Sequence, residues 1–353
     1  MKKNLFFTLA TAALLASCSS ENDELFNTTP EGQSDELTEI KLSATSLSVD
    51  ADSSQKKMAT RAAFEGNISG TNQLVALVPL STNENDFSTP YEGSSHGTIT
   101  FTNGSATGFT TPQYYPAKDD TPIYMVGLYP AEEWTEIATT AKHSIDGKTD
   151  IMHANQQQTT KNAGKGGTYP TLTFNHLLTK LDIVIKGENE SAVSAWGKIT
   201  SLKLKKARTS TGMAVPYNQL KVTLKDGAVS YEELTTGDIA CWQTSDDKEI
   251  STSNMVTVTT EQSTAQAYVL APAVTASATG DDAEYELEVT TEKITTPVTV
   301  KVDLKTTAGT EDFTGDTKGK AFTVTLNFKA TEIKVNATVT DWVPGGIASE
   351  DIQ

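Results

Sequence analysis

Cysteine is scarce in this sequence, which has only Cys18 and Cys241 among its 353 residues. Two cysteines cannot build a disulfide framework, and neither has a second cysteine or a nearby histidine at the spacing of a zinc site. The 37% of hydrophobic residues is enough for a core without such supports. We therefore expect no metal, and we expect Cys241 to be a small buried hydrophobic residue.

Long apolar runs are also missing. The only candidate, residues 4–16, is shorter than the ~20 residues that a membrane-spanning helix needs, and a polar stretch follows it directly. Residues 1–17 therefore read as a secretion signal. Its end, Leu15-Ala16-Ser17-Cys18, resembles a bacterial lipobox, so we expect Cys18 to be acylated and to anchor the precursor in the outer membrane. The alternative is an ordinary signal peptide with a chance cysteine.

Positive charge is in short supply, because 28 Lys and Arg face 45 Asp and Glu, for a net charge of -17. Such a surface repels phosphate backbones, so no nucleic-acid partner is expected. Part of the excess, Glu21, Asp23 and Glu24, lies directly behind Cys18. This acidic group is either an export tag of surface lipoproteins or a solvated tether.

Catalytic patterns are absent as well. The four histidines have no helical metal-ligand spacing, there is no Gly-x-Ser-x-Gly motif, and Asp150 with His153 is a weak dyad without a nucleophile. We expect His176 to be a structural, hydrogen-bonded residue of a strand. The four tryptophans could form a sugar-stacking platform, but core packing fits most of them better. The sequence thus predicts no catalytic residues and no cofactor.

What the sequence does contain is the alternation of apolar and polar residues that is typical of β-strands. Residues 18–61 are polar and poor in aromatics, as in an extended arm, except for one stretch in which Ile40, Leu42 and Ala44 alternate and Leu47 and Val49 alternate after a one-residue slip. This predicts a strand with a bulge inside the arm.

The remainder predicts an all-β fold of sandwiches or barrels. From its length we expect two domains, residues 62–190 and 191–353, with a boundary near Gly187 to Trp196. Only Ala131 to Lys142 has a helical pattern. The alternating segments are 181–185, 202–204, 220–224, 285–289, 298–304, 322–328 and 333–339.

Several segments, in their order along the chain, resemble the fimbrillin family of type V pilus subunits. They are "IYMVGLYP" (123–130), "KTDIMHA" (148–154), "TFNHLLTKLDIVI" (173–185) and "IKVNATVTDWVPGG" (333–346). The resemblance implies two tandem transthyretin-like β-sandwich domains and no catalysis. It also implies a lipoprotein precursor that an arginine-specific protease cuts between Arg61 and Ala62, and subunits that polymerise by strand exchange into an extracellular adhesive pilus.

The scarcity of arginine explains why a protease specific for this residue type would cut at few places, Arg61 among them. Of the 28 basic residues 26 are Lys, because only Arg61 and Arg208 are arginine (28 − 2 = 26). An arginine-specific protease therefore finds two sites, and we expect Arg208 to be folded away. The alternative for Arg61 is an ordinary linker residue.

If the strand of Ile40, Leu42, Ala44, Leu47 and Val49 caps a groove in the precursor, cleavage releases the cap, and a strand from another subunit, like or unlike, can fill its place. The short polar tail after residue 342 leaves open whether the subunit belongs to the shaft or the tip. The alternative function is a surface-anchored glycan-binding lipoprotein of a polysaccharide-uptake system.

Overall fold

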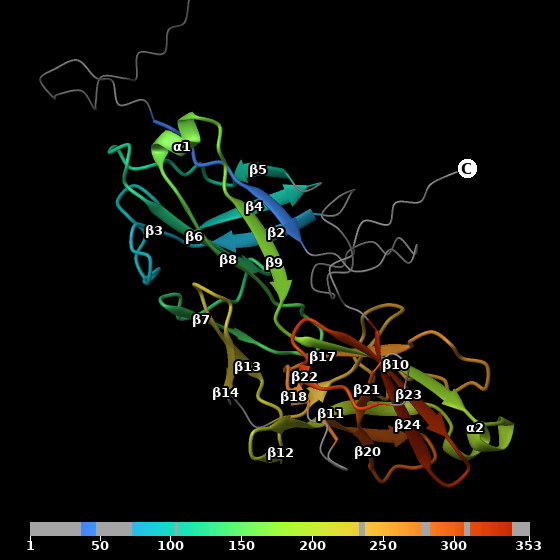
Figure 1. Ribbon diagram of the computed structural model, residues 1–353. Coiled ribbons are helices and arrows are strands. Elements are labelled where there is room, and N and C mark those ends of the chain that lie inside the picture. Colours follow the sequence, from blue (N-terminus) through green and yellow to red (C-terminus); the bar gives the residue numbers. More distant parts are fainter. Residues whose placement is uncertain are drawn as a thin grey trace, which may run out of the picture. The chain divides into compact units, whose positions relative to one another are not determined.

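The computed structural model describes residues 37–46, 73–102, 105–232, 237–276, 283–306 and 311–340 (Figure 1). The prediction of an all-β fold is confirmed, because the described residues form twenty-four strands and only two short helices, α1 (Lys161–Lys165) and α2 (Glu190–Trp196). All seven alternating segments named above overlap strands, and only Leu224 and Asp303 within them lie outside a strand. None of the helices in the described part of the chain is long and apolar enough to span a membrane.

The first sheet gathers eight strands from residues 43–176. In spatial order they are β2 (Gln73–Val78), β4 (Gly97–Thr102), β5 (Ser105–Phe109), β1 (Ser43–Ser46), β9 (Thr171–His176), β8 (Met152–Thr159), β6 (Ile123–Tyr129) and β3 (Leu80–Ser81). In addition β2 meets β6 through the pair Leu77 and Leu128. The sheet therefore curls round until β2 and β6 touch, and it encloses its own core.

That first core is made by the inward side chains of these strands and of the residues just before β1. Along β2 and β4 every second side chain points into this core, as expected for a strand with one buried face. Phe101 and Phe174 meet edge to face, with ring centroids 6.0 Å apart. The core residues are Ile40, Leu42, Leu74, Ala76, Val78, Leu80, Ile99, Phe101, Phe109, Tyr115, Ile123, Met125, Met152, Ala154, Leu172 and Phe174.

The second half of the chain packs two sheets over a larger core. One sheet runs in the order β16 (Trp242–Gln243), β17 (Ala267–Ala271), β10 (Thr179–Gly187), β23 (Ala321–Phe328), β24 (Ile333–Thr340) and β21 (Leu304–Lys305). The other contains β12 (Gly212–Ala214), β11 (Ile199–Thr209), β19 (Tyr285–Thr291) and β20 (Val298–Val302), with β15 (Ile239–Ala240) also on β11. A small pair joins β18 (Thr275–Ala276) and β22 (Gly315–Asp316).

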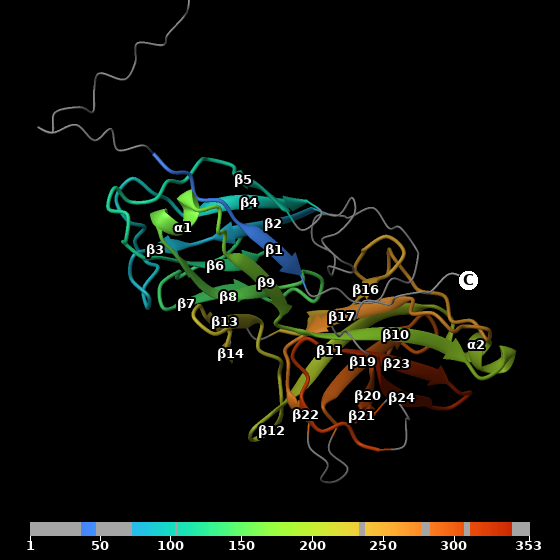
Figure 2. The same ribbon diagram turned by 45° about the horizontal axis from the view of Figure 1, so that its top comes forward.

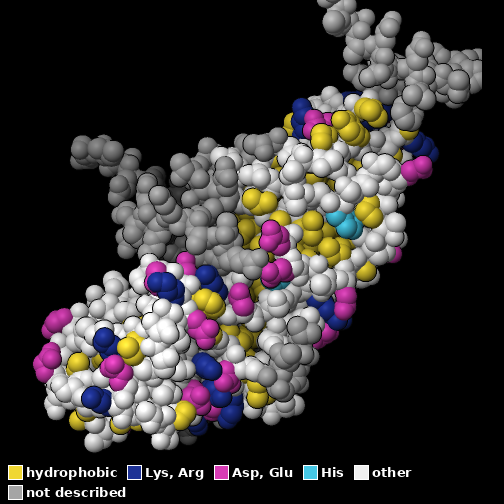
Figure 3. Space-filling model, turned by 180° about the vertical axis from the view of Figure 1, so that it is seen from behind, with side chains coloured by type: hydrophobic (Ala, Val, Ile, Leu, Met, Phe, Trp, Pro, Cys, Tyr) yellow, Lys and Arg dark blue, Asp and Glu magenta, His cyan; other side chains and the backbone are white. Residues whose placement is uncertain are grey.

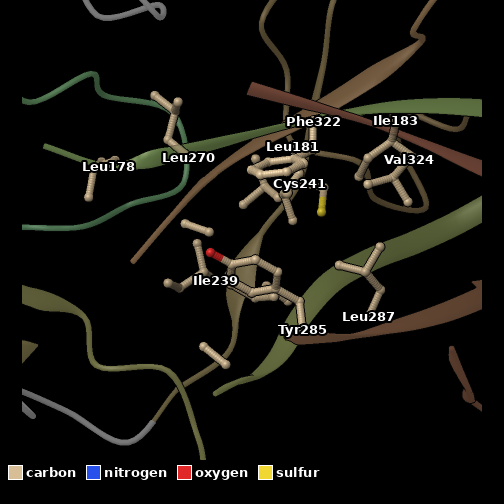
Figure 4. Packing of buried hydrophobic residues seen from close by; sticks show 14 of the residues in the cluster. Leu178, Leu181, Ile183, Ile239, Cys241, Leu270, Tyr285, Leu287, Phe322 and Val324 are labelled. Atoms are coloured by element: carbon tan, nitrogen blue, oxygen red, sulfur yellow. The ribbon is translucent and has the colours of Figure 1, made fainter. Parts of the chain in front are cut away.

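Cys241 lies inside this larger core, fully buried and unpaired, which confirms the prediction made for it. Figure 4 shows its sulfur among the side chains of Leu181, Phe322 and Val324. Burial in apolar surroundings raises the pKa of the thiol far above its ordinary value, so Cys241 behaves as a hydrophobic residue.

A three-stranded sheet combines residues from both halves of the chain. Its order is β14 (Val229–Glu232), β13 (Gln219–Thr223) and β7 (Thr140–Ser144), and β13 pairs with β7 over its whole length. Apart from the three strands of this sheet, β1 to β9 belong to the first sheet and β10 to β24 belong to the other sheets. Strand pairing does not test which parts fold independently, so the division into domains 62–190 and 191–353 stays a prediction.

The predicted helix over Ala131 to Lys142 is wrong. The segment folds back on itself, because Thr135 and Lys142 exchange both backbone hydrogen bonds, each 2.9 Å long. Glu133 and Glu136 have φ values of 68° and 52°, which a right-handed helix cannot contain. Trp134 is buried and donates its indole N–H to the Pro130 carbonyl at 2.7 Å, so tertiary packing overrides the helical pattern.

The helix α2 was missed, although its capping residues are visible in the sequence. The side chain of Asn189 accepts a hydrogen bond from the Ala192 N–H at 2.9 Å, and Gly197 follows the helix with a φ of 71°. Trp196 at its end is buried against Phe328, with ring centroids 5.3 Å apart. Trp134 and Trp196 are thus core residues and not parts of a sugar-stacking surface.

Candidate functional site: the N-terminal strand of the first sheet

The arm residues 38–40 make the first of two contacts with the first sheet. They run antiparallel to residues 113–115, with Glu39 opposite Tyr114. The Ile40 N–H donates to the Gln113 carbonyl at 2.8 Å, and the Tyr115 N–H donates to the Thr38 carbonyl at 3.0 Å. These bonds hold the arm where it enters the sheet.

The second contact is β1, which lies inside the sheet, between β5 and β9. It runs parallel to β9, from Ser43 opposite Thr171 to Ser46 opposite Phe174, and Ser43 also faces Ser105 of β5 in an antiparallel pair. The blue strand beside β9 can be followed in Figure 2. The other pairings between described strands of this sheet are antiparallel. β1 therefore enters as a single parallel strand in an antiparallel sheet.

Burial alternates along the arm just before β1. Ile40 is fully buried and Leu42 is 5% exposed, whereas Lys41 between them faces solvent. Both aliphatic side chains belong to the first core, with Leu74, Phe101 and Phe174 among its other members. Each such side chain contributes ~1.5–3 kcal/mol on burial, so the arm is part of the folded core and not only a tether.

The other predicted site residues are placed as follows. Ala44 lies in β1, opposite Leu172 of β9. Leu47, Val49, Cys18, Arg61 and Ala62 lie outside the described residues. Acylation, cleavage and the capping role of the strand therefore remain predictions.

Arg208, the second arginine, lies in β11 and is largely buried. Its backbone pairs with Met213 of β12 on one side, and its N–H donates to the Glu284 carbonyl at 2.8 Å on the other. Its Nε is 3.6 Å from a carboxylate oxygen of Glu284, and its side chain is 14% exposed. A protease needs an extended, unpaired backbone, so the folded state protects this arginine, as expected.

The buried histidines have structural partners and do not form a catalytic group. Asp150 pairs with His176 and not with His153, at 2.8 Å between the Oδ2 and Nδ1 atoms. His153 instead donates from Nε2 to the Leu224 carbonyl at 2.8 Å, which ties β8 to the end of β13. His176 is thus a buried residue of β9 that lies against a carboxylate, in agreement with the structural role expected for it. No group of three or more His, Cys, Asp or Glu within the described ranges could hold a metal ion.

His153 predicts a loss of stability in acid. Burial lowers its pKa from 6.5 to about 4, so between these values the unfolded chain binds a proton that the folded chain rejects. The free energy of unfolding then falls as the pH drops, by ~1.4 kcal/mol per pH unit and roughly 3 kcal/mol in total. Urea unfolding at pH 7 and pH 5 should show a weaker pH dependence for His153→Gln than for the wild type. If the free energy of unfolding depends on pH equally in both chains, groups other than His153 cause the dependence.

The charged side chains on the described surface are mixed in sign. On the face shown in Figure 3, acidic and basic side chains are interspersed and do not gather into a patch of one sign. Exposed ion pairs include those of Lys248 with Asp246, at 2.6 Å, and Lys334 with Glu332, at 3.7 Å. Exposed pairs of this kind contribute ~0–1 kcal/mol each, so they serve solubility more than stability.

Sequence reasoning missed the residues that receive the arm. Gln113, Tyr114 and Tyr115 carry no motif, and β5 is not among the alternating segments. The family-like segment 173–185 includes the end of β9, but nothing in it indicates that this strand pairs with the arm. Only the non-local pairing of the folded chain identifies them.

Comparison with known proteins supports the fold and supplies a family. A family model described as Fimbrillin-like matches residues 60–342. Among solved structures, the chain is similar to a proposed cell adhesion protein from Bacteroides uniformis, with 17% identity and a TM-score of 0.51 over 87% of this chain and 100% of that chain. No curated protein sequence matches it significantly.

Two further solved structures are more distant. A proposed cell adhesion protein from Bacteroides ovatus has 14% identity and a TM-score of 0.49, over 88% of this chain and 99% of that one. A fimbrial protein from Bacteroides vulgatus has 14% identity and a TM-score of 0.43, over 86% and 99%.

The family model spans most of the chain and includes the larger core, the three-stranded sheet and all of the first core except Ile40 and Leu42. Such a match supports a structural role in a cell-surface pilus, and not an enzymatic one. The protein therefore belongs to the fimbrillin-like family.

Proposed function

We propose that the chain is exported as an outer-membrane lipoprotein acylated at Cys18, is cut after Arg61, and joins a pilus when a strand of another subunit replaces β1. The observation that carries this proposal is the parallel strand β1 between β5 and β9. It comes from the arm that precedes Arg61, so one cleavage separates it covalently from the rest of the sheet.

Departure of β1 would expose two kinds of surface. The N–H and C=O groups of β9 that face residues 43–46 would lose their partners, and an unpaired strand edge readily pairs with another chain. When residues 38–42 follow β1, the first core would also lose Ile40 and Leu42 and would open toward solvent. A strand with aliphatic residues at alternate positions satisfies both needs, which is why a second subunit is the partner proposed here.

The same contacts explain why the precursor would not assemble early. Ile40 and Leu42 together contribute ~3–6 kcal/mol by burial, and each backbone hydrogen bond adds ~0.5–1.5 kcal/mol. While the arm is covalently attached, its high local concentration keeps the groove filled. Cleavage removes that advantage without breaking the bonds, so exchange should be slow and should need an incoming strand.

The direct test of this proposal examines acylation at Cys18 and cleavage after Arg61, the two ends of the arm. A fatty-acid probe should label the wild-type precursor and not Cys18→Ala, and terminal sequencing of the extracellular protein should begin at Ala62. Equal labelling of both chains would refute the lipid anchor. An extracellular chain that begins at Cys18 would refute the cleavage.

A mature chain that still begins at Cys18 would favour the alternative, a glycan-binding surface lipoprotein. One feature of the described residues is relevant to it. A hollow of ≈ 740 Å³ in the second half of the chain is lined by Arg208, Tyr217, Tyr231 and Pro272 together with several hydroxyl groups. Retardation of the protein in gels that contain polysaccharide, and its loss in Tyr217→Ala, would then identify a sugar site.

A further inference from the structure

The arm is held unevenly along its length. Its two buried aliphatic residues, Ile40 and Leu42, precede β1, whereas β1 itself has the sequence Ser-Ala-Thr-Ser. Residues of these types have less apolar surface to bury than isoleucine or leucine, and the backbone of β1 pairs with that of β9. The arm is therefore bound to the first sheet more strongly at residues 38–42 than at β1. Residues 38–42 are the end of the described arm that is farther from Arg61 along the sequence.

The segment that receives residues 38–40 is anchored by a buried amide. Gln113 is 2% exposed, and its Nε2 donates to the Ser95 hydroxyl and to the Thr111 carbonyl, both at 3.0 Å. The Ser95 N–H donates to its Oε1 at 2.9 Å. A fully bonded buried amide has one stable orientation, because any other leaves polar groups unpaired at a cost of ~1–3 kcal/mol each. The backbone carbonyl of Gln113, which accepts the hydrogen bond from the Ile40 N–H, is thereby held in place.

The next two residues have anchors of their own. The Tyr114 carbonyl accepts a hydrogen bond from the Tyr91 hydroxyl at 2.5 Å. Tyr115 is buried, and its hydroxyl lies 3.1 Å from that of Thr159 in β8. Its ring also lies against Gly164 of α1, where an added Cβ would come within 2.6 Å of the ring. None of these anchors uses an arm residue, so the segment keeps its shape when the arm moves.

We propose that residues 113–115 form a latch that holds residues 38–40 after cleavage, so that β1 separates first, from Ser46 toward Ser43, and the latched residues separate last. A cleaved subunit then stays on its lipid-anchored arm until an incoming strand has begun to pair with β9. This inference rests on the proposed function for its biological meaning, but the latch itself can be tested in the uncut chain.

Hydrogen exchange of the uncut full-length precursor is the first measurement. Gln113→Leu should accelerate exchange of the amides in residues 38–46 at least ~10-fold, the effect of losing about 1.4 kcal/mol. Amides of β6 should keep their wild-type rates. The matched control is Gln158→Leu, the same change at an exposed position of β8. An unchanged arm in Gln113→Leu, or equal acceleration in β6, would overturn the latch.

A milder variant guards against misfolding. Ser95→Ala removes only the hydroxyl that accepts from Gln113, and its own N–H still donates to the amide oxygen. Ser95 is exposed, so we expect the fold to be retained and the arm to exchange about threefold faster, since a shared bond contributes less than the whole anchor. Wild-type exchange of the arm in this variant and in Gln113→Leu would refute the role of the amide.

Cleavage provides the second measurement. After treatment with an arginine-specific protease, the arm fragment should co-elute with the body of the wild-type chain in gel filtration and should dissociate from that of Gln113→Leu. Immediate dissociation from the wild type would overturn the latch. If the protease does not cut after Arg61, the proposed maturation fails, and the exchange experiment alone decides on the latch.

Discussion

A chain that carries both Ile40→Asp and Leu42→Asp is expected to lose its N-terminal strand from the first sheet. Both side chains are buried in the first core, and an unpaired carboxylate there costs several kcal/mol, in addition to the ~3–6 kcal/mol of lost burial. That sum exceeds what the remaining backbone bonds of the arm can offset. Residues 38–46 should then exchange their amide hydrogens as freely as an unfolded segment.

The functional consequence should appear without any protease. With its groove open, the double variant should form detergent-resistant, heat-labile ladders, or aggregate, when other pilus subunits are present. Lys41→Asp is the matched control, because it lies between the two sites, faces solvent and lowers the net charge by the same two units. It should behave as the wild type. A double variant that remains monomeric, with residues 38–46 still protected, would show that this strand is not the cap.

Arg61→Lys is expected to abolish maturation while leaving the fold intact. An arginine-specific protease does not accept lysine, and the other arginine, Arg208, is protected by its pairing with β12 and Glu284. The variant should accumulate at the outer membrane as a full-length, lipid-labelled precursor, and extracellular pili that contain it should disappear. Immunoblots of membrane and shed fractions, with terminal sequencing, measure this.

The matched control for this experiment is Arg208→Lys. It removes the second arginine but keeps a positive charge near Glu284, so it should be processed and assembled like the wild type. Mature protein that begins at Ala62 in Arg61→Lys cells would mean that the protease does not depend on arginine. Blocked processing in Arg208→Lys would point to that residue as the true cleavage site.

The two helical segments illustrate why local patterns can fail. Residues 131–142 have helical periodicity, but burial of Trp134 and the paired backbones of Thr135 and Lys142 stabilise a hairpin-like turn instead. The short helix α2 has no long periodic pattern, and its Asn cap and following Gly are detectable only when capping is considered. Tertiary contacts outweigh propensities of a few tenths of a kcal/mol per residue.

By itself the sequence determined the strand segments, the buried Cys241 and the resemblance to a pilus family. It could do so because alternation of apolar and polar residues records which face of a strand is buried, and because rare residue types such as Cys18 and Arg61 are visible without a fold. It also marked Ile40 and Leu42 as buried side chains, although the strand that follows them begins only at Ser43.

Only the tertiary structure decided where that strand goes. Alternation specifies a buried face but not a partner, and the pairing of Ser43 with Thr171 joins positions that are far apart in the chain. The parallel direction of β1, its place between β5 and β9, and the support of residues 38–40 by Gln113 all follow from how distant segments pack. Non-local contacts of this kind are selected by the shape of the assembled core and by the need to pair every buried backbone group, and neither can be read from one segment at a time.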